Sequence, residues 1–159
     1  MKKLLLFYLI TFTLYLASPQ TAAELDTLLQ TETVSIATTA RFVLGAADLL
    51  PAGLTGGEPR LSGSAGNTGT AAQTAAYQMA LERGWTKKSA AENATLQDTA
   101  FLIMNAFDLK GGIMYTLFRN PRYAYREMVY RRLIQGRAYS TMTASGQRLL
   151  HIIGRTINE

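Results

Sequence analysis

Apolar residues recur at three- and four-residue intervals along most of this chain, which is the spacing of one face of an α-helix. The clearest instance follows Ser35, a residue type that favours helix N-caps. One helix face there would carry Ile36, Ala40, Val43, Leu44 and Ala47. No stretch shows the strong alternation of a half-buried strand. The spacing therefore predicts a mainly α protein.

Local start and stop signals divide the chain into five or six helices after its N-terminal segment. Asn120-Pro121 places an N-cap residue before a proline at the first helical position. Gly84 is expected just after a helix end, and Thr95 with Asp98 resembles a capping box. The expected helices cover about residues 24–33, 36–50, 70–83, 95–109, 121–135 and 145–153. Residues 112–118 fit either a buried helix or a short strand.

Residues 52–69 interrupt the helical pattern. Six of these eighteen residues are glycine, and the sequence matches neither common glycine-rich phosphate-binding motif. We expect a flexible loop.

Residues 1–23 have the layout of a cleavable bacterial export signal. Lys2 and Lys3 precede an uncharged run of apolar and hydroxyl residues over 4–17, and small residues follow. About 14 helical residues reach roughly 21 Å, less than the roughly 30 Å of a hydrocarbon core. We expect cleavage near Ala23, with a retained anchor as the alternative. The remainder, residues 24–159, is expected to be one helical domain in the periplasm or cell envelope.

The chain has no cysteine and one histidine, His151. A disulfide, a thiolate nucleophile, a thiolate metal site and a lipid-modified cysteine are therefore excluded. His151 stands among Leu149, Leu150, Ile152 and Ile153, so we expect it in or beside the core. We predict no catalytic residue, metal or cofactor, and export makes nucleic acid a poor partner.

Charge is divided unevenly along the chain. Residues 24–109 hold five basic and nine acidic side chains, whereas residues 110–159 hold nine basic and two acidic ones. Two explanations stay open: the halves neutralise each other on packing, or a basic face binds an anionic partner.

The segment 119–137 concentrates the basic charge, with six arginines and three tyrosines. Its arginines do not share one helix face, so the pattern does not favour a simple amphipathic membrane helix. Arginines can pair with carboxylates inside the fold or recognise anions outside it, and tyrosines can stack on sugar rings. The candidate binding residues are Arg119, Arg122, Tyr123, Tyr125, Arg126, Tyr130, Arg131, Arg132 and Arg137.

Two stretches resemble degenerate S-layer homology (SLH) repeats, which are helical envelope modules. One is TVSIATTARFVLGAADLL at residues 33–50. The other spans residues 75–107, where Leu81-Glu-Arg-Gly84 ends a helix and Thr95-Leu-Gln-Asp98-Thr-Ala100 begins one. The Thr-Arg-Ala-Glu signature of that family is absent, and residues 110–159 have no counterpart in the pattern. The resemblance implies a helical envelope module and, less directly, binding to cell-wall glycans.

These observations predict an exported, non-enzymatic envelope or periplasmic protein, with a structural or interaction role. Its Arg/Tyr-rich C-terminal half would engage an anionic envelope component or an acidic protein, with peripheral contact to membrane or cell wall. The alternatives are an SLH-like glycan-binding module and an enzyme acting on envelope polymers.

Overall fold

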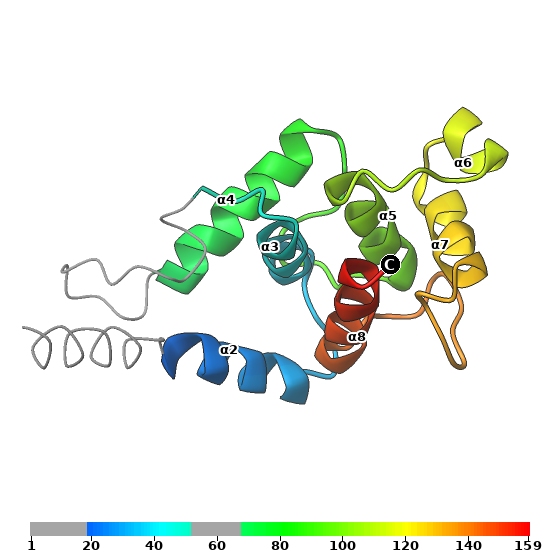
Figure 1. The fold of residues 1–159 in the computed structure, drawn as a ribbon. Helices are drawn as coiled ribbons and strands as arrows, with labels where there is room; N and C mark the ends of the chain where they lie inside the picture. Colours follow the sequence, from blue (N-terminus) through cyan, green and yellow to red (C-terminus); the bar gives the residue numbers. More distant parts are fainter. Residues whose placement is uncertain (1–18, 52–67) are drawn as a thin grey trace, which may run out of the picture.

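The computed structural model describes residues 19–51 and 68–159, and Figure 1 shows their fold. The seven helices of this part are α2 (Pro19–Gln30), α3 (Ile36–Ala46), α4 (Thr68–Glu82), α5 (Leu96–Ala106), α6 (Ile113–Leu117), α7 (Pro121–Tyr130) and α8 (Gly146–Ile157). The described residues contain isolated β-bridges but no strand. The predicted mainly α, single-domain bundle is therefore confirmed, and the ambiguous segment before residue 118 is a short helix.

Two predicted features lie largely outside the described residues. They are the export signal, of which residues 1–18 are not described, and the glycine-rich loop, of which residues 52–67 are not described. The described end of that loop corrects the prediction, because α4 begins at Thr68 instead of Thr70.

The predicted N-caps are confirmed by side-chain hydrogen bonds. Ser35 Oγ accepts from Thr38 N at 3.2 Å, and Asn120 Oδ1 accepts from Tyr123 N at 3.1 Å. Before α8, Ser145 Oγ accepts a hydrogen bond from Arg148 N at 3.3 Å. These contacts satisfy amides that have no partner inside the helix, so they fix where each helix starts.

Several helix ends differ from the prediction. The sequence predicts that α5 ends near Leu109 and α7 near Gln135, but α5 ends at Ala106 and α7 at Tyr130. The chain turns out of α5 at Asp108 and out of α7 at Arg132, whose φ angles are 48° and 60°. A left-handed residue at this position ends a helix even when it is not glycine, so glycine-based rules place the end too late.

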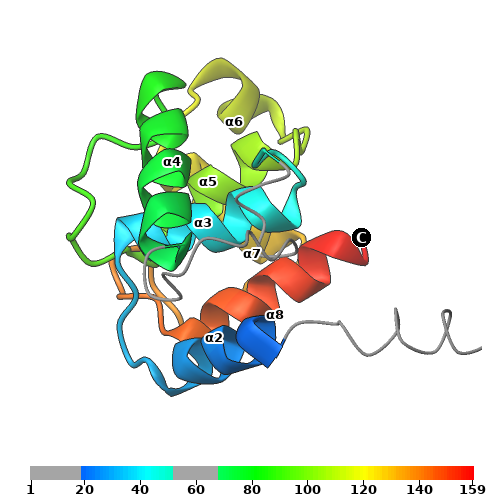
Figure 2. The ribbon, with the colours of Figure 1, turned by 90° about the vertical axis from the view of Figure 1, so that its left-hand side faces the viewer.

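Helices α3, α5 and α8 form the centre of the bundle, and each carries one outer helix. Helix α4 packs on α3, α7 packs on α5, and α2 packs on α8. Figure 2 shows α2 beside α8 and α4 beside α3. The three central helices supply fully buried side chains, among them Leu44, Ile103 and Ile152. The molecule is thus built from three helix pairs around one core.

A closed ring of backbone hydrogen bonds joins the three pairs just before the central helices begin. Val34 N donates to Ala144 O at 3.0 Å, Ala144 N donates to Ala94 O at 2.9 Å, and Ala94 N donates to Val34 O at 2.9 Å. All three residues are buried. The segments before α3, α5 and α8 therefore occupy equivalent positions in this ring. We call each segment, together with the central helix that follows it, a unit.

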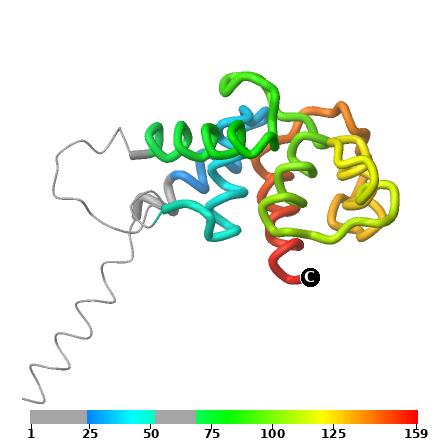
Figure 3. The backbone as a smooth tube through the Cα atoms, turned by 90° about the horizontal axis from the view of Figure 1, so that it is seen from above, coloured from blue at the N-terminus to red at the C-terminus, as the bar shows by residue number. Residues whose placement is uncertain are grey.

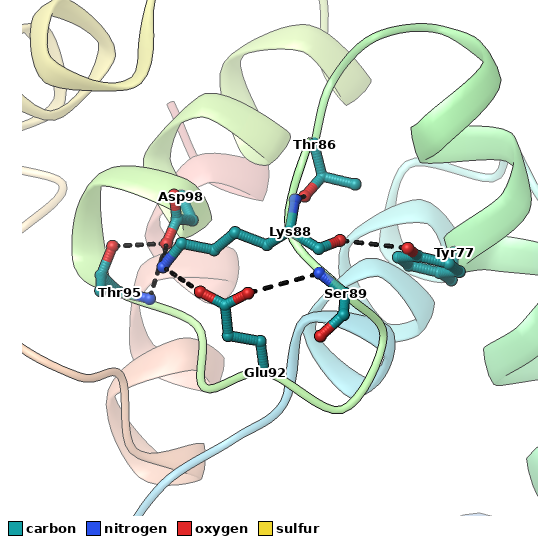
Figure 4. A network of polar contacts seen from close by, with 7 residues as sticks. All are labelled: Tyr77, Thr86, Lys88, Ser89, Glu92, Thr95 and Asp98. Atoms are coloured by element: carbon teal, nitrogen blue, oxygen red, sulfur yellow. Dashed lines mark hydrogen bonds and ion pairs between the residues drawn. The ribbon is translucent and has the colours of Figure 1, made fainter.

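A polar network holds the connection between α4 and α5 (Figure 4). Lys88 Nζ lies 2.9 Å from Asp98 Oδ2 and 3.4 Å from Glu92 Oε1, and Asp98 also accepts from Thr95 N at 3.0 Å. Burial would lower the pKa of Lys88, but its bonds to the two carboxylates outweigh burial and raise it. Asp98, the carboxylate of the predicted capping box, thus also forms an ion pair with Lys88.

Candidate functional site

Arg131, at the end of α7, contacts both acidic residues of the basic half. Its Nε donates to Glu127 Oε1 at 3.1 Å, and its Nη1 donates to Glu159 Oε1 at 3.0 Å. Glu127 and Glu159 are the two acidic side chains of residues 110–159. Arg131 therefore forms ion pairs with both acidic side chains of this half.

The contacts of Arg131 are structural. Its side chain is 24% exposed, and its guanidinium also donates to the carbonyl of Lys110. Burial would lower the pKa of Arg131, but the hydrogen bonds and charges of Glu127 and Glu159 outweigh burial and raise it. Arg131 thus ties α7 to the C-terminus and to the segment before α6, which makes it the least suited of the candidate arginines to an outside partner.

The other five candidate arginines are exposed, and none of them forms an ion pair within the described residues. They are Arg119, Arg122, Arg126, Arg132 and Arg137. The described carboxylates of the acidic half that form ion pairs, Glu24, Glu92 and Asp98, pair with Arg41 or Lys88 of the same half. Within the described residues, therefore, no ion pair joins the acidic half to the basic half.

The three candidate tyrosines separate into two kinds. Tyr123 and Tyr125 are half-buried against the core, and the Tyr123 ring stacks on Phe118 with centroids 6.0 Å apart. Tyr130 is 84% exposed at the end of α7. Of the predicted tyrosines, Tyr130 is the one whose ring a partner could reach fully.

A second basic region, which the sequence analysis missed, lies along α8. Arg148, His151 and Arg155 line a cavity of about 540 Å³ together with Glu32. Positions 148, 151 and 155 share one helix face, so their spacing would have predicted this grouping. The expectation for His151 was wrong: the residue is exposed, because the buried face of α8 is formed by Leu149, Ile152, Ile153 and Thr156.

The guanidinium groups in this cavity are held by neutral acceptors. Arg148 Nη2 donates to Arg137 O at 3.3 Å, and Arg155 Nη1 donates to Leu133 O at 3.3 Å. Arg148 Nη1 also lies 3.1 Å from the sulfur of Met142. Carbonyl and thioether acceptors orient a guanidinium without neutralising it, so both side chains keep their charge for an anionic group.

Another cavity of about 540 Å³ lies between α2, α3 and α4. Its arginine, Arg41, pairs with Glu24 and lies 5.6 Å from the centre of the Phe42 ring. This cavity carries no uncompensated arginine and is less suited to an anion than the α8 cavity.

The described residues hold neither a metal-binding cluster nor a membrane-spanning helix. No group of three or more potential metal ligands comes together among them. None of the helices in this part of the chain has the length and hydropathy needed to cross a membrane. Comparisons with known protein families, curated proteins and solved structures find no match for this chain.

Proposed function

We propose that this is an exported, non-enzymatic interaction protein of the bacterial envelope, and that the arginines of its C-terminal half bind an anionic partner. The observation that carries the proposal is that, among the described residues, Arg131 is the ion-pair partner of both Glu127 and Glu159. Eight other basic side chains of residues 110–159 have no ion pair among the described residues. They are Lys110, Arg119, Arg122, Arg126, Arg132, Arg137, Arg148 and Arg155.

The chemistry of these groups favours carboxylate or phosphate ligands. A guanidinium offers a planar fork of donors that matches both groups, and it stays charged at any physiological pH. Unpaired cations gathered on one half of a molecule raise the local potential and steer anionic partners toward it. The predicted export signal places such partners in the envelope, where acidic proteins, wall polymers and lipid headgroups are found.

Retention on purified envelope fractions tests this proposal. Arg122→Ala/Arg126→Ala and Arg148→Ala/Arg155→Ala each remove two positive charges, and we expect each pair to reduce retention several-fold. Retention of the unchanged protein should fall steeply between 0.05 and 0.5 M salt, because the Debye length shortens from more than about 10 Å to less than about 8 Å.

The matched control is Arg83→Ala/Lys87→Ala, which removes the same charge from exposed positions in the acidic half. It should leave retention unchanged. Retention that resists salt and survives both arginine pairs would refute an electrostatic partner.

An SLH-like wall-binding module is the second candidate. The ring of backbone hydrogen bonds supports it, because the two stretches that resemble SLH repeats, 33–50 and 75–107, each contribute one residue to that ring. A wall binder should sediment with cell wall that has been stripped of protein, whereas a protein that binds an acidic protein should stay in the supernatant. An enzyme is the least favoured alternative, since His151 and Glu32 line one cavity but are not joined by a hydrogen bond.

A further inference from the structure

Helix α6 exposes an apolar surface that the arginine-based function does not explain. Ile113 is 83% exposed, Met114 57%, Leu117 69%, and Phe118, just after the helix, 51%. Within the helix, at about 100° per residue, Ile113, Met114 and Leu117 fall within an arc of about 100°. They therefore form one continuous apolar face, which we call the α6 face.

The α6 face is held in place from its opposite side. Tyr115 is buried, and its ring meets Phe101 edge-on with centroids 6.5 Å apart. Gly111 lies directly beneath this ring, since a Cβ at that position would stand 2.4 Å from Tyr115 Cδ1. Gly112 N donates to Glu127 Oε2 at 3.0 Å. The exposure of the α6 face is thus fixed by packing.

Basic side chains border the α6 face along the chain. Lys110 precedes the helix, and Arg119 and Arg122 follow it, all exposed. The carboxylate joined to this region, Glu127, is bonded to Gly112 and Arg131, which leaves Asp108 as the exposed acid nearest in sequence. The exposed charged side chains that flank the α6 face in sequence are therefore mainly cationic.

The shape of this region favours a lipid surface over a protein groove. Figures 1 and 3 show α6 at the outer end of the molecule, on the far side from α4. A helix of five residues is about 7.5 Å long, so its exposed apolar surface is short. A short projecting apolar tip flanked in sequence by cationic side chains matches an anionic bilayer in both shape and charge.

We propose that the α6 face inserts into the surface of a membrane containing anionic phospholipid, while Lys110, Arg119 and Arg122 pair with headgroup phosphates. This inference rests on the proposed function and names one anionic partner for it.

The absence of cysteine allows a direct test on the full chain. Leu117→Cys labelled with an environment-sensitive dye reports from the α6 face, and Leu81→Cys, 41% exposed on α4, is the matched control. With phosphatidylglycerol vesicles we expect the Leu117 dye to brighten and shift to the blue. We expect no change at Leu81, and none at either position with phosphatidylcholine vesicles.

Two further variants separate the apolar from the cationic contribution to vesicle binding. Arg119→Ala/Arg122→Ala in the labelled chain should weaken the vesicle response several-fold and reduce its salt dependence. Ile113→Ser in the same chain should weaken the response and leave that salt dependence intact. Circular dichroism confirms that each variant is folded.

A silent dye at Leu117 with anionic vesicles overturns the membrane inference. A response that depends on protein concentration without vesicles also overturns it, because a second copy would then cover the α6 face. If envelope retention still depends on Arg148 and Arg155 while the dye is silent, the membrane inference alone fails. If retention is also insensitive to salt and to both arginine pairs, the proposed function fails with it.

Discussion

Two equivalent threonines differ in whether their buried hydroxyl is hydrogen-bonded. Thr39 in α3 and Thr99 in α5 both lie four residues after the N-cap and are both fully buried. Thr39 Oγ1 donates to Ser35 O at 2.9 Å, whereas Thr99 Oγ1 has no partner in the part of the chain that the structure describes. A buried hydroxyl without a partner loses its hydration and gains nothing in return.

Replacing each threonine by valine, which keeps the shape, should therefore have opposite effects. We expect Thr99→Val to raise the free energy of unfolding by about 1 kcal/mol and Thr39→Val to lower it by about 1 kcal/mol. Urea unfolding followed by circular dichroism measures both. Equal shifts of the same sign would contradict the assigned difference between the two hydroxyls.

At the scale of elements, the contact between α2 and α8 depends on the absence of a side chain at Gly146. A Cβ there would lie 1.7 Å from the backbone carbonyl oxygen of Leu28, whereas a Cβ at Gly154 of the same helix meets nothing within 4 Å. Backbone cannot yield as a side-chain tip can, so Gly146→Ala should force α2 away from α8. We expect a loss of about 3 kcal/mol in the free energy of unfolding.

Gly154→Ala is the control within the same helix. It should raise stability by about 0.5–1 kcal/mol, because alanine is favoured over glycine inside a helix. Thermal unfolding compares the two variants with the unchanged protein. A small effect of Gly146→Ala would mean that α2 is not seated on α8 in solution.

Gly146 also shows why two of the units begin their central helix with a buried apolar side chain and the third does not. The first residue of the central helix is Ile36 in one unit and Leu96 in another, and both are fully buried apolar side chains. In the third unit the carbonyl of Leu28 occupies that space, so glycine replaces the apolar residue. The contact between position 146 and the Leu28 backbone is made by the fold, so a pattern of apolar residues in the sequence does not predict glycine at this position.

Other predictions succeeded or failed according to how local their cause is. The caps at Ser35 and Asn120 bond to amides three residues away, so the sequence predicts them. The Arg131 pair with Glu127 spans four residues and could have been predicted, whereas its bond to Glu159 spans 28 and follows from the fold. Because Glu159 bonds to Arg131, the other arginines of this half have no carboxylate partner among the described residues. The candidate site could therefore be identified only from the structure.

For the whole molecule, the ring of Val34, Ala94 and Ala144 makes the three helix pairs depend on one another. The N–H of each residue in the ring donates to a residue of one other helix pair, and its carbonyl accepts from a residue of the third. Each of these hydrogen bonds joins residues that are 50 or more positions apart in the sequence. Since all three residues are buried, water reaches one of these amides only if the segments separate. A ring closed in this way should open as a single event.

Amide hydrogen exchange tests this cooperativity. The amides of Val34, Ala94 and Ala144 should exchange at one common slow rate set by global unfolding. The amides of Thr116 and Phe118 bond only within the short α6 segment, so local opening should let them exchange orders of magnitude faster. If Ala144 instead exchanges as fast as Thr116 while Val34 and Ala94 stay protected, the α8 unit opens independently and the ring does not couple the three pairs.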